Sequence, residues 1–237
     1  MRTADICELN SIQPGKGATG GFLSQLSPAA LKEFQALAIP TSYPSGSVLF
    51  LEGQAPRGVF LLLEGEIKLS LGSSGGKTLI LRLARPGELL GLMSTISGQP
   101  YELTGEAMYP CQVAYLRRDD FQRFLAKFPE VNQSVVRSLS AHYRSACEQL
   151  RTLGLSGSAH EKLAKLLLDR CESAVDTREG MRVRLPLTHE EIAELIGTSR
   201  ETVTRTLSEF RSRRLVTRHG GTFIIPNRQA LASFAAA

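Results

Sequence analysis

Residues 187–207 read LTHEEIAELIGTSRETVTRTL, and this stretch predicts two short helices joined by a tight turn. Thr188, followed three residues later by Glu191, forms a capping box that starts the first helix. Gly197 supplies the turn, because glycine readily adopts the left-handed conformation that ends a helix, and Ser199 caps the second helix. The apolar positions that pack the two helices together are Ile192, Ala193 and Ile196 in the first and Val203, Leu207 and Phe210 in the second. The stretch therefore predicts a helix-turn-helix.

The outward face of the second helix carries polar and charged side chains, at Arg200, Glu201, Thr204, Arg205 and Ser208. Arginine can donate two parallel hydrogen bonds to O6 and N7 of guanine, and glutamate can accept one from N4 of cytosine. A carboxylate on this face favours reading of bases over plain attraction to phosphate, although an acid near a helix N-terminus also stabilises the helix itself. We therefore expect double-stranded DNA as a partner. The predicted contacts are Thr198, Ser199, Arg200, Glu201, Thr202, Thr204, Arg205 and Arg218.

Positive charge is concentrated beside this helix. Residues 200–218 hold six arginines and two glutamates, which amounts to +4 of the chain's net charge of +5. Such a basic cluster is typical of a surface that binds phosphates, although a basic helix face can also be merely solvated. Two short apolar runs, 215–217 and 222–225, flank a Gly-Gly pair and predict a β-hairpin wing. The wing is expected to bring Arg218 to the DNA backbone, where a contact positions the protein without reading sequence.

A long helix is predicted before the motif, within residues 118–154. Between Asp120 and Leu153 there is no glycine and one proline, and apolar residues recur at alternating spacings of three and four. This seam predicts a dimerisation helix and a homodimer, although the pattern also fits a helix that packs on its own domain. The seam consists of Val136, Leu139, Tyr143, Ala146, Leu150 and Leu153. A glycine- and serine-rich stretch, 154–158, ends the helix and predicts a hinge.

The chain before this helix has the pattern of a β-domain. Eleven of the 21 glycines lie between positions 46 and 105, where they separate short apolar runs. Short strands divided by glycine turns predict an antiparallel barrel or sandwich. The predicted strands are 48–51, 59–63, 67–71, 78–83, 103–107 and 112–116, with a hairpin loop at 73–76 and a helix capped by Ser27 in front. We therefore expect three parts: a sensor domain with an N-terminal helix at 1–117, a dimerisation helix at 118–154 and a DNA-binding domain at 155–237.

The composition argues against several functional classes. No apolar run approaches the roughly 20 residues that span a bilayer, and the N-terminus lacks the apolar core of a signal peptide. We therefore expect a cytoplasmic protein with no membrane partner. Four scattered cysteines, Cys7, Cys111, Cys147 and Cys171, fit neither a structural zinc site nor a disulfide framework. No Ser/His/Asp set, paired-carboxylate motif or phosphate-binding glycine loop is evident, so we expect a protein that is not an enzyme.

The order of parts resembles the cyclic-AMP receptor protein / fumarate-nitrate regulator (Crp/Fnr) family of bacterial transcription factors over residues 20–230. The strongest element runs from Thr198 to Arg205 and is similar to the family's Arg-Glu-Thr-Val-x-Arg recognition helix. The resemblance implies an α+β fold: a β-roll sensor like the cyclic-nucleotide-binding fold, a dimerisation helix and a C-terminal winged helix-turn-helix. It also implies that Arg200, Glu201 and Arg205 read a TGTGA-like half-site of a palindrome, and that RNA polymerase is a partner.

The sensor domain departs from the family's cyclic-nucleotide pattern. Nucleotide-binding members hold the ribose with Phe-Gly-Glu and the phosphate with Arg-Ser-Ala, and the corresponding residues here are Leu90-Gly91-Leu92 and Tyr101-Glu102-Leu103. Leu92 thus replaces the ribose acceptor, and Tyr101 replaces the phosphate arginine. Glu102 and Glu106 lie nearby, and no lysine or arginine occurs between positions 85 and 117. Because a buried phosphate needs positive charge or backbone donors, cyclic AMP is not expected to bind in the usual mode.

The other sensing groups of the family fit no better. An iron–sulfur cluster needs four cysteine thiolates, three of them near the N-terminus, where this chain has Cys7 alone. Haem needs an axial ligand, for which His142 on the long helix is the candidate, and a redox contact through Cys147 across a dimer is conceivable. We therefore expect an unknown small-molecule effector or none, with Gly91, Leu92, Tyr101 and Glu102 as candidate pocket residues. The alternative is a small-molecule-binding sensor module whose DNA-binding domain is vestigial.

Overall fold

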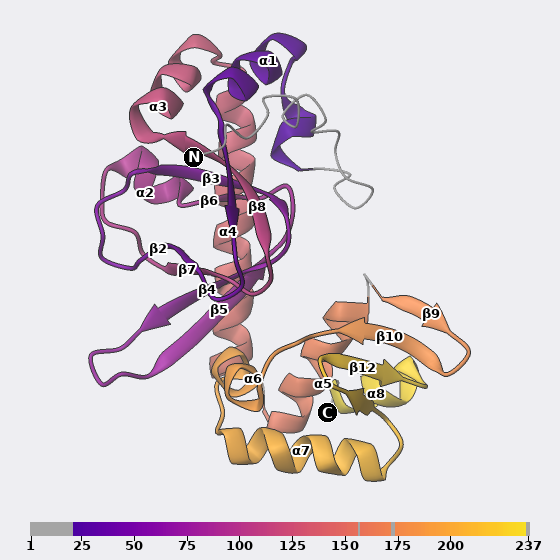
Figure 1. Cartoon of the computed structure of the whole chain (residues 1–237). Helices are drawn as coiled ribbons and strands as arrows, with labels where there is room; N and C mark the ends of the chain where they lie inside the picture. Colours follow the sequence, from indigo (N-terminus) through magenta and orange to yellow (C-terminus); the bar gives the residue numbers. More distant parts are fainter. Residues whose placement is uncertain (1–20, 156, 172–173, 236–237) are drawn as a thin grey trace. The chain divides into compact units, whose positions relative to one another are not determined.

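A computed structural model of the protein describes residues 21–155, 157–171 and 174–235. Cys7 lies outside the described residues. The chain divides into two compact units, Met1–Ala146 and Cys147–Ala237, and each unit combines helices with antiparallel strands (Figure 1). Helix α4 (Val131–Gly154) contributes residues to both units. This architecture confirms the predicted α+β class, with a β-domain, a long helix and a C-terminal helix-turn-helix in that order.

Two four-stranded antiparallel sheets form the β-roll of the first unit. One sheet has the strand order β1 (Ile39–Tyr43), β8 (Cys111–Arg117), β3 (Gly58–Glu64), β6 (Leu89–Leu90). The other has the order β2 (Val48–Phe50), β7 (Thr104–Ala107), β4 (Ile67–Gly72), β5 (Thr78–Ala84). The predicted hairpin loop joins β4 to β5. Strand β1 is not predicted from sequence, because its residues are mostly exposed and it contains Pro40, which strands seldom tolerate away from an edge.

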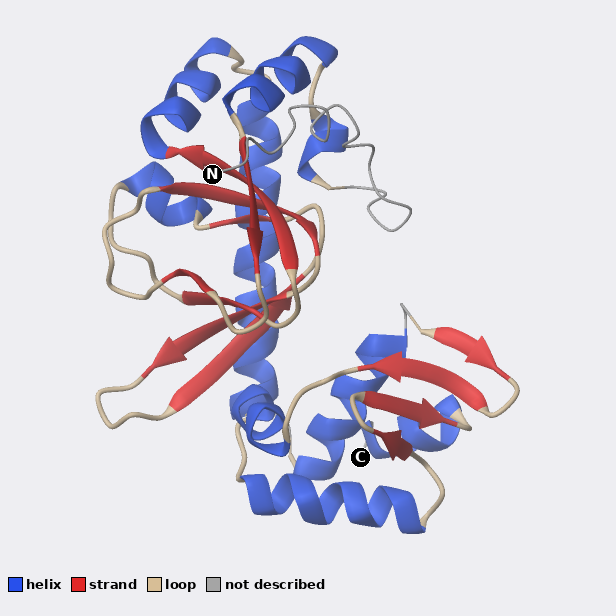
Figure 2. Ribbon diagram, viewed as in Figure 1, coloured by secondary structure: helices blue, strands red, loops and turns tan. Residues whose placement is uncertain are grey.

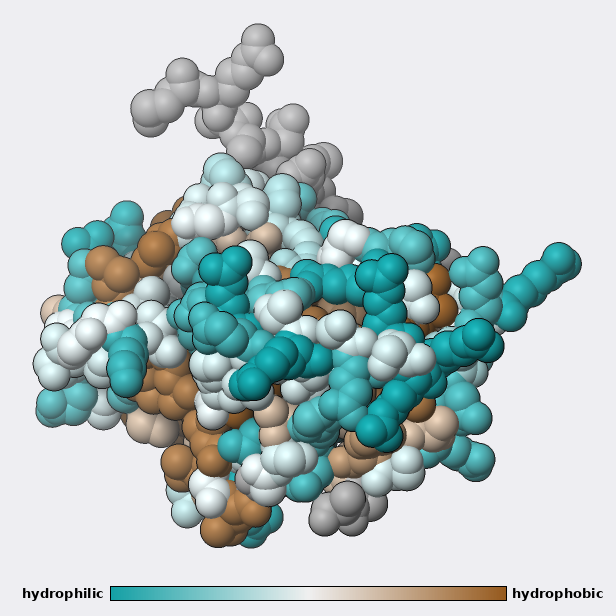
Figure 3. Space-filling model, turned by 90° about the horizontal axis from the view of Figure 1, so that it is seen from below, coloured by the Kyte–Doolittle hydropathy of each residue, from teal (hydrophilic) through white to brown (hydrophobic). Residues whose placement is uncertain are grey.

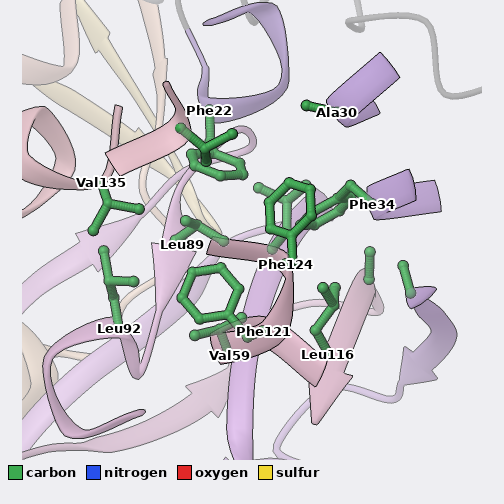
Figure 4. Packing of buried hydrophobic residues seen from close by; sticks show 14 residues of the cluster. Phe22, Ala30, Phe34, Val59, Leu89, Leu92, Leu116, Phe121, Phe124 and Val135 are labelled. Carbon is green, nitrogen blue, oxygen red and sulfur yellow. The ribbon is translucent and has the colours of Figure 1, made fainter. Parts of the chain in front are cut away.

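Strand β3 is buried on both faces and separates two hydrophobic clusters, because successive side chains of a strand point to opposite sides of the sheet. Val59 and Leu61 belong to a cluster that includes residues of the surrounding helices (Figure 4). Phe60 and Leu62 belong to a second cluster, to which both sheets contribute. The helical elements of this unit besides α4 are η2 (Phe22–Gln25), α1 (Pro28–Leu37), α2 (Leu92–Ser97) and α3 (Arg118–Lys127). Ser27 caps α1, as expected.

The segment 118–154 contains two helices, which corrects the prediction of a single dimerisation helix. Helix α3 ends at Lys127, and α4 begins at Val131. The break has a local cause, because the ring of Pro129 disfavours helical backbone angles at the preceding residue. Phe128 accordingly has φ −126° and ψ 76°, outside the helical range. Only α4 therefore carries the apolar seam.

The second unit is a winged helix-turn-helix (Figure 2). Its helices after α4 are α5 (Ala159–Arg170), α6 (His189–Ile196), α7 (Arg200–Ser212) and α8 (Arg228–Ala235). Its antiparallel sheet has the order β11 (Thr217–His219), β12 (Thr222–Ile225), β10 (Gly180–Arg184), β9 (Val175–Thr177). The β11–β12 hairpin confirms the predicted wing. Strand β9 carries too little apolar alternation to be predicted, whereas β10 alternates apolar and basic residues from Met181 to Arg184, a signal that could have identified it. In the described part of the chain, no helix is long and apolar enough to cross a membrane.

Candidate nucleic-acid interface

Local capping interactions set the geometry of the helix-turn-helix. The Thr188 hydroxyl accepts a hydrogen bond from the Glu191 backbone N–H (3.1 Å), and the Glu191 carboxylate accepts one from the Thr188 N–H (2.9 Å). Gly197 follows α6 with φ +65°, a left-handed conformation. Ser199 caps α7 by accepting from the Thr202 N–H at 3.2 Å. These contacts confirm the capping box, the turn and the second cap expected from the sequence.

Helix α7 buries one face and exposes the opposite one. Its buried side chains are Val203, Thr206 and Phe210. Leu207, expected to point inward, is only half-buried, which corrects the predicted packing face. Positions 206 and 207 lie equally far, about 50°, from the centre of the face defined by Val203 and Phe210, and it is Thr206 that packs inward. The rest of the predicted helix-packing face is buried, namely Ile192, Ala193 and Ile196 of α6.

The outward face of α7 matches the sequence expectation. Its exposed side chains are Arg200, Glu201, Thr204, Arg205 and Ser208. Hydrophilic side chains cover much of the face seen in Figure 3, which looks onto α7 from below. The remaining predicted contacts are partly engaged in the turn, because the hydroxyls of Ser199 and Thr202 lie 3.0 Å apart and Thr198 is half-buried.

Glu201 is held at the start of α7. Hydrogen bonds from its own backbone N–H and from the Ser199 side chain lower the pKa of its carboxyl group, and the charges of Arg200 and Arg205 lower it further. Glu201 is therefore an anion in the free protein and stabilises the helix N-terminus. To accept a hydrogen bond from a base, the carboxylate has to exchange these partners for the base amino group.

One contact across the two helices was not anticipated from sequence. The Nδ1 atom of His189, the first residue of α6, lies 2.8 Å from the Thr204 hydroxyl of α7. That hydroxyl also donates to the Arg200 carbonyl at 3.0 Å. Burial and the charges of Arg218 and Arg200 lower the pKa of His189. No local pattern identifies this pair, because the two residues are 15 positions apart and belong to different helices.

Arg218 has a structural role that sequence reasoning missed. Its guanidinium donates to the Gly220 carbonyl (2.9 Å) and to the Leu187 carbonyl (2.8 Å), and it lies over the Phe223 ring at 5.1 Å. Burial lowers its pKa. Arg218 thus ties the wing to the segment before α6, with part of its donor capacity already used, and the expected phosphate contact stays a prediction.

The C-terminal half of α7 is fixed by a second set of charged contacts. Glu209 lies 2.7 Å from the imidazole of His160 on α5 and 2.7 Å from the Arg213 guanidinium. The Arg213 guanidinium in turn lies 5.3 Å from the centre of the Phe234 ring on α8. Of the six arginines between positions 200 and 218, Arg213 and Arg218 therefore serve the packing of the unit.

The predicted dimer seam on α4 separates into two rows. Val136, Tyr143 and Leu150, spaced seven residues apart, are 59%, 72% and 66% exposed. The intervening row, Leu139, Ala146 and Leu153, is half-buried. Leu139 packs against the helical cluster of the first unit, and Leu153 lies against Gly197, where a Cβ atom would come within 2.5 Å of its side chain. The exposed row is thus an apolar stripe along one helix.

Tyr101 fills the candidate effector pocket of the β-roll with its own side chain. Its buried ring packs against the Phe50 ring at a tilt of 34°, with 4.7 Å between ring centres. Its hydroxyl donates to the Gly58 carbonyl at 2.8 Å and accepts from the Arg57 and Gly58 N–H groups. Gly91 lies so close that a Cβ atom there would come within 2.8 Å of the tyrosine ring. The tyrosine is therefore fully packed and fully hydrogen-bonded inside the β-roll.

The four candidate pocket residues do not form one site. Gly91 and Tyr101 are neighbours, but Leu92 is buried in the separate helical cluster, and Glu102 accepts a hydrogen bond from the Ser94 hydroxyl at 2.6 Å. The prediction that these residues line a common pocket is thus corrected. The cause lies in α2, which starts at Leu92 and turns its first side chain into the core.

Lys68 and Arg82, which lie outside positions 85–117, bring positive charge to this unit. Lys68 on β4 pairs with Glu106 at 3.2 Å, and Arg82 on β5 pairs with Glu88. His142 on α4 lies 4.0 Å from Glu88. Burial, together with the charge of Arg82, lowers the pKa of His142 to about 4. Strand pairing and the α4 helix bring these residues together from distant parts of the chain.

The remaining cysteines have ordinary surroundings. Cys111 and Cys171 are buried, their thiols donate to backbone carbonyls, and burial raises both pKa values. Cys147 on α4 is half-buried. Within residues 21–155, 157–171 and 174–235, no group of three or more histidine, cysteine or acidic side chains is arranged to hold a metal ion.

Two family models match the two units of this chain. A cyclic nucleotide-binding domain matches residues 40–128, and a Crp-like helix-turn-helix domain matches residues 161–234. Among curated proteins, the chain is 30% identical over 165 residues to the cyclic AMP receptor protein of Thermus thermophilus, covering 70% of this chain and 73% of the relative. It is 26% identical over 217 residues to a CRP-like cAMP-activated global transcriptional regulator of Mycobacterium tuberculosis, covering 91% and 96%.

The fold is shared with solved structures. FixK2 from Bradyrhizobium japonicum superposes with a TM-score of 0.74 at 23% identity, and the match covers 84% of this chain and 98% of that protein. Three observations indicate the same family. They are the order of β-domain, long helix and winged helix, the match to a Crp-like helix-turn-helix domain, and the relative at 30% identity. The chain belongs to the Crp/Fnr family of DNA-binding transcription regulators.

Proposed function

We propose that this regulator binds a TGTGA-like palindrome as a homodimer and reads its bases with α7. The observation that carries the proposal is the row of exposed side chains on α7, opposite its buried face. The proposed DNA contacts are Thr198, Ser199, Arg200, Glu201, Thr202, Thr204, Arg205 and, at the wing, Arg218. Arg200 and Arg205 suit guanine, and Glu201 suits cytosine.

The exposed row Val136, Tyr143 and Leu150 supports the proposed homodimer. Two copies of α4 packed along this stripe would remove the three side chains from water, which favours association. Leu139, Ala146 and Leu153, the rest of the predicted seam, would form the flanks of the interface. A two-fold dimer presents two copies of α7, and half-sites about one turn of DNA apart match that symmetry.

The sensor domain is proposed to respond to an effector other than cyclic AMP, or to none. Tyr101 supports this proposal, because its ring fills the space beside Gly91 and its hydroxyl is hydrogen-bonded to the Gly58 carbonyl. A thermal shift titration with cyclic AMP is expected to leave the melting temperature unchanged. A rise of several degrees that saturates with concentration would contradict the proposal, because a ligand that binds the native state stabilises it.

The wider assignments follow from the same family. We propose a sensor at 1–117, a dimer-forming segment at 118–154 and a DNA-binding domain at 155–237, with RNA polymerase as a further partner, a cytoplasmic location and no enzymatic activity. A DNA-binding domain that has lost its role is disfavoured by its intact caps and its exposed Arg200, Glu201 and Arg205.

Fluorescence anisotropy with labelled DNA tests the proposed readout. The full-length protein is expected to bind a TGTGA palindrome more tightly than a scrambled duplex by about 1,000-fold or more, within the range of specific regulators. Arg200→Ala is expected to lose about 10-fold or more on the palindrome and little on the scrambled duplex, since a base contact contributes roughly 1–3 kcal/mol. Arg85→Ala, which removes an exposed charge from the sensor unit, is the control and should change neither. Equal loss on both duplexes for Arg200→Ala would mean that Arg200 contacts phosphate only.

A further inference from the structure

Thr204 is held in one orientation on the exposed face of α7. Its hydroxyl donates to the Arg200 carbonyl at 3.0 Å and lies 2.8 Å from Nδ1 of His189. A threonine hydroxyl carries a single proton. Because that proton is directed to the Arg200 carbonyl, the hydroxyl accepts the second hydrogen bond from Nδ1–H of His189. These two partners therefore fix the side-chain rotamer.

His189 is itself well placed for this contact. It is the first residue of α6, directly after the Thr188 cap, and is half-buried. The charged groups around it are Arg200 on α7, Arg218 on β11 and the adjacent Glu190 on its own helix. Nδ1 carries a proton in the tautomer that donates to Thr204 and also in the charged ring. The contact therefore persists whether the imidazole is neutral or protonated.

We infer that Thr204 reads a thymine through its methyl group, and that His189 is the positioning residue that keeps this methyl group facing the DNA. The inference rests on the proposed function, in which α7 enters the major groove. With its only proton bound to Arg200, the Thr204 hydroxyl has no donor left for a base. Its methyl group is the remaining apolar feature, and the C5 methyl of thymine is the apolar feature that the major groove offers.

The test uses the full-length protein and a bound palindrome in which single thymines are replaced by deoxyuridine, which lacks only the C5 methyl. At one thymine position of the half-site, each replacement is expected to weaken binding about fourfold, the effect of leaving one methyl group unburied. Thr204→Val carries a methyl group at both branch positions, so it needs no hydrogen bond to direct one of them toward the DNA, and it should keep this thymine preference. Thr204→Ser, its matched partner, keeps the hydroxyl and should lose the preference. The opposite pattern would show that the hydroxyl reads the base, and would overturn the inference.

A second pair of variants tests His189. His189→Asn can still donate from its side-chain amide toward Thr204, and it should keep the thymine preference. His189→Phe keeps an aromatic ring without a donor, and it should reduce the preference below twofold while the melting temperature of the protein stays close to that of the parent. An unchanged preference in His189→Phe would exclude the positioning role.

The outcomes separate this inference from the proposed function. If the parent protein binds palindrome and scrambled DNA equally, both fail. If it binds the palindrome specifically but no thymine-to-deoxyuridine replacement alters the affinity, the methyl contact fails and the proposed function stands.

Discussion

At the residue scale, the positive charge near α7 performs two different tasks. Arg200 and Arg205 are exposed, whereas Arg213 pairs with Glu209 and Arg218 bonds two backbone carbonyls. The sequence predicts the cluster, because the arginines are close together in the chain. It does not predict their division, because partners such as Leu187 for Arg218 lie 31 positions away.

Arg218→Ala is expected to destabilise the winged unit. The change removes two hydrogen bonds from a charged donor and the contact with Phe223, for a loss of about 1–3 kcal/mol in the free energy of unfolding. Urea unfolding followed by circular dichroism measures this loss. Arg211→Ala, which removes an exposed arginine of α7, should change stability by less than about 0.5 kcal/mol. Equal stability of the two variants would show that the Arg218 contacts are unimportant to the fold.

His142 makes the stability of the sensor unit depend on pH. Its pKa in the folded state, about 4, lies below the ordinary value of 6.5. Between these values the unfolded chain binds more protons, so stability is highest above pH 6.5 and falls as the pH drops toward 4. From pH 7 to 4.5 the expected contribution of His142 is a loss of about 2 kcal/mol.

Tyrosine fluorescence during urea unfolding reports this loss, because all five tyrosines lie between positions 43 and 143, within the first unit. His142→Gln removes the titrating group and should lessen the pH dependence by that amount. A variant whose stability falls as steeply as that of the parent would assign the pH dependence to other groups.

At the element scale, sequence predicts best what is decided locally. The capping box of α6, the Ser199 cap of α7, the glycine turn and the β4–β5 hairpin depend on residues within a few positions of one another, and they are confirmed. Strands β1 and β9 are not predicted, because their residues are largely exposed and show little apolar alternation. The break at Pro129 is also local, because the proline by itself separates α3 from α4.

Gly197→Ala is expected to weaken the turn between α6 and α7. Alanine at φ +65° is strained by about 1 kcal/mol, and its Cβ would also lie 2.5 Å from the Leu153 side chain. Gly220→Ala is the matched control, since Gly220 has φ +58° but nothing within 4 Å of a Cβ. Thermal unfolding should show the larger loss at Gly197. Equal losses would mean that backbone strain alone matters and that the Leu153 contact adds nothing.

The stripe on α4 predicts an oligomeric state. Leu150→Glu places a charge on the proposed interface and is expected to convert a dimer to a monomer in analytical ultracentrifugation. Because palindrome binding uses two copies of α7, its affinity should fall by 10-fold or more. Val175→Glu, at a position equally exposed on β9, should leave the dimer intact. A Leu150→Glu protein that stays dimeric would locate the interface elsewhere.

At the scale of the whole molecule, the family and the order of parts are predictable from sequence, and the interior of the sensor is not. The replacement of an arginine by Tyr101 argues against cyclic AMP, but only the structure places its ring between Gly91 and Phe50. Likewise, Lys68 and Arg82 enter the unit through strand pairing. Contacts between residues far apart in the chain determine these features, so local patterns do not reveal them.

Selection of bound sequences from a pool of random duplex DNA tests the central claim most directly. The account predicts enrichment of one palindrome with G·C pairs in each half-site and half-site centres about one helical turn, roughly 10 base pairs, apart. The same selection with Arg200→Ala should lose preference at the base pair that Arg200 contacts. Recovery of DNA with no shared sequence, at an affinity that depends on salt alone, would contradict base reading by α7.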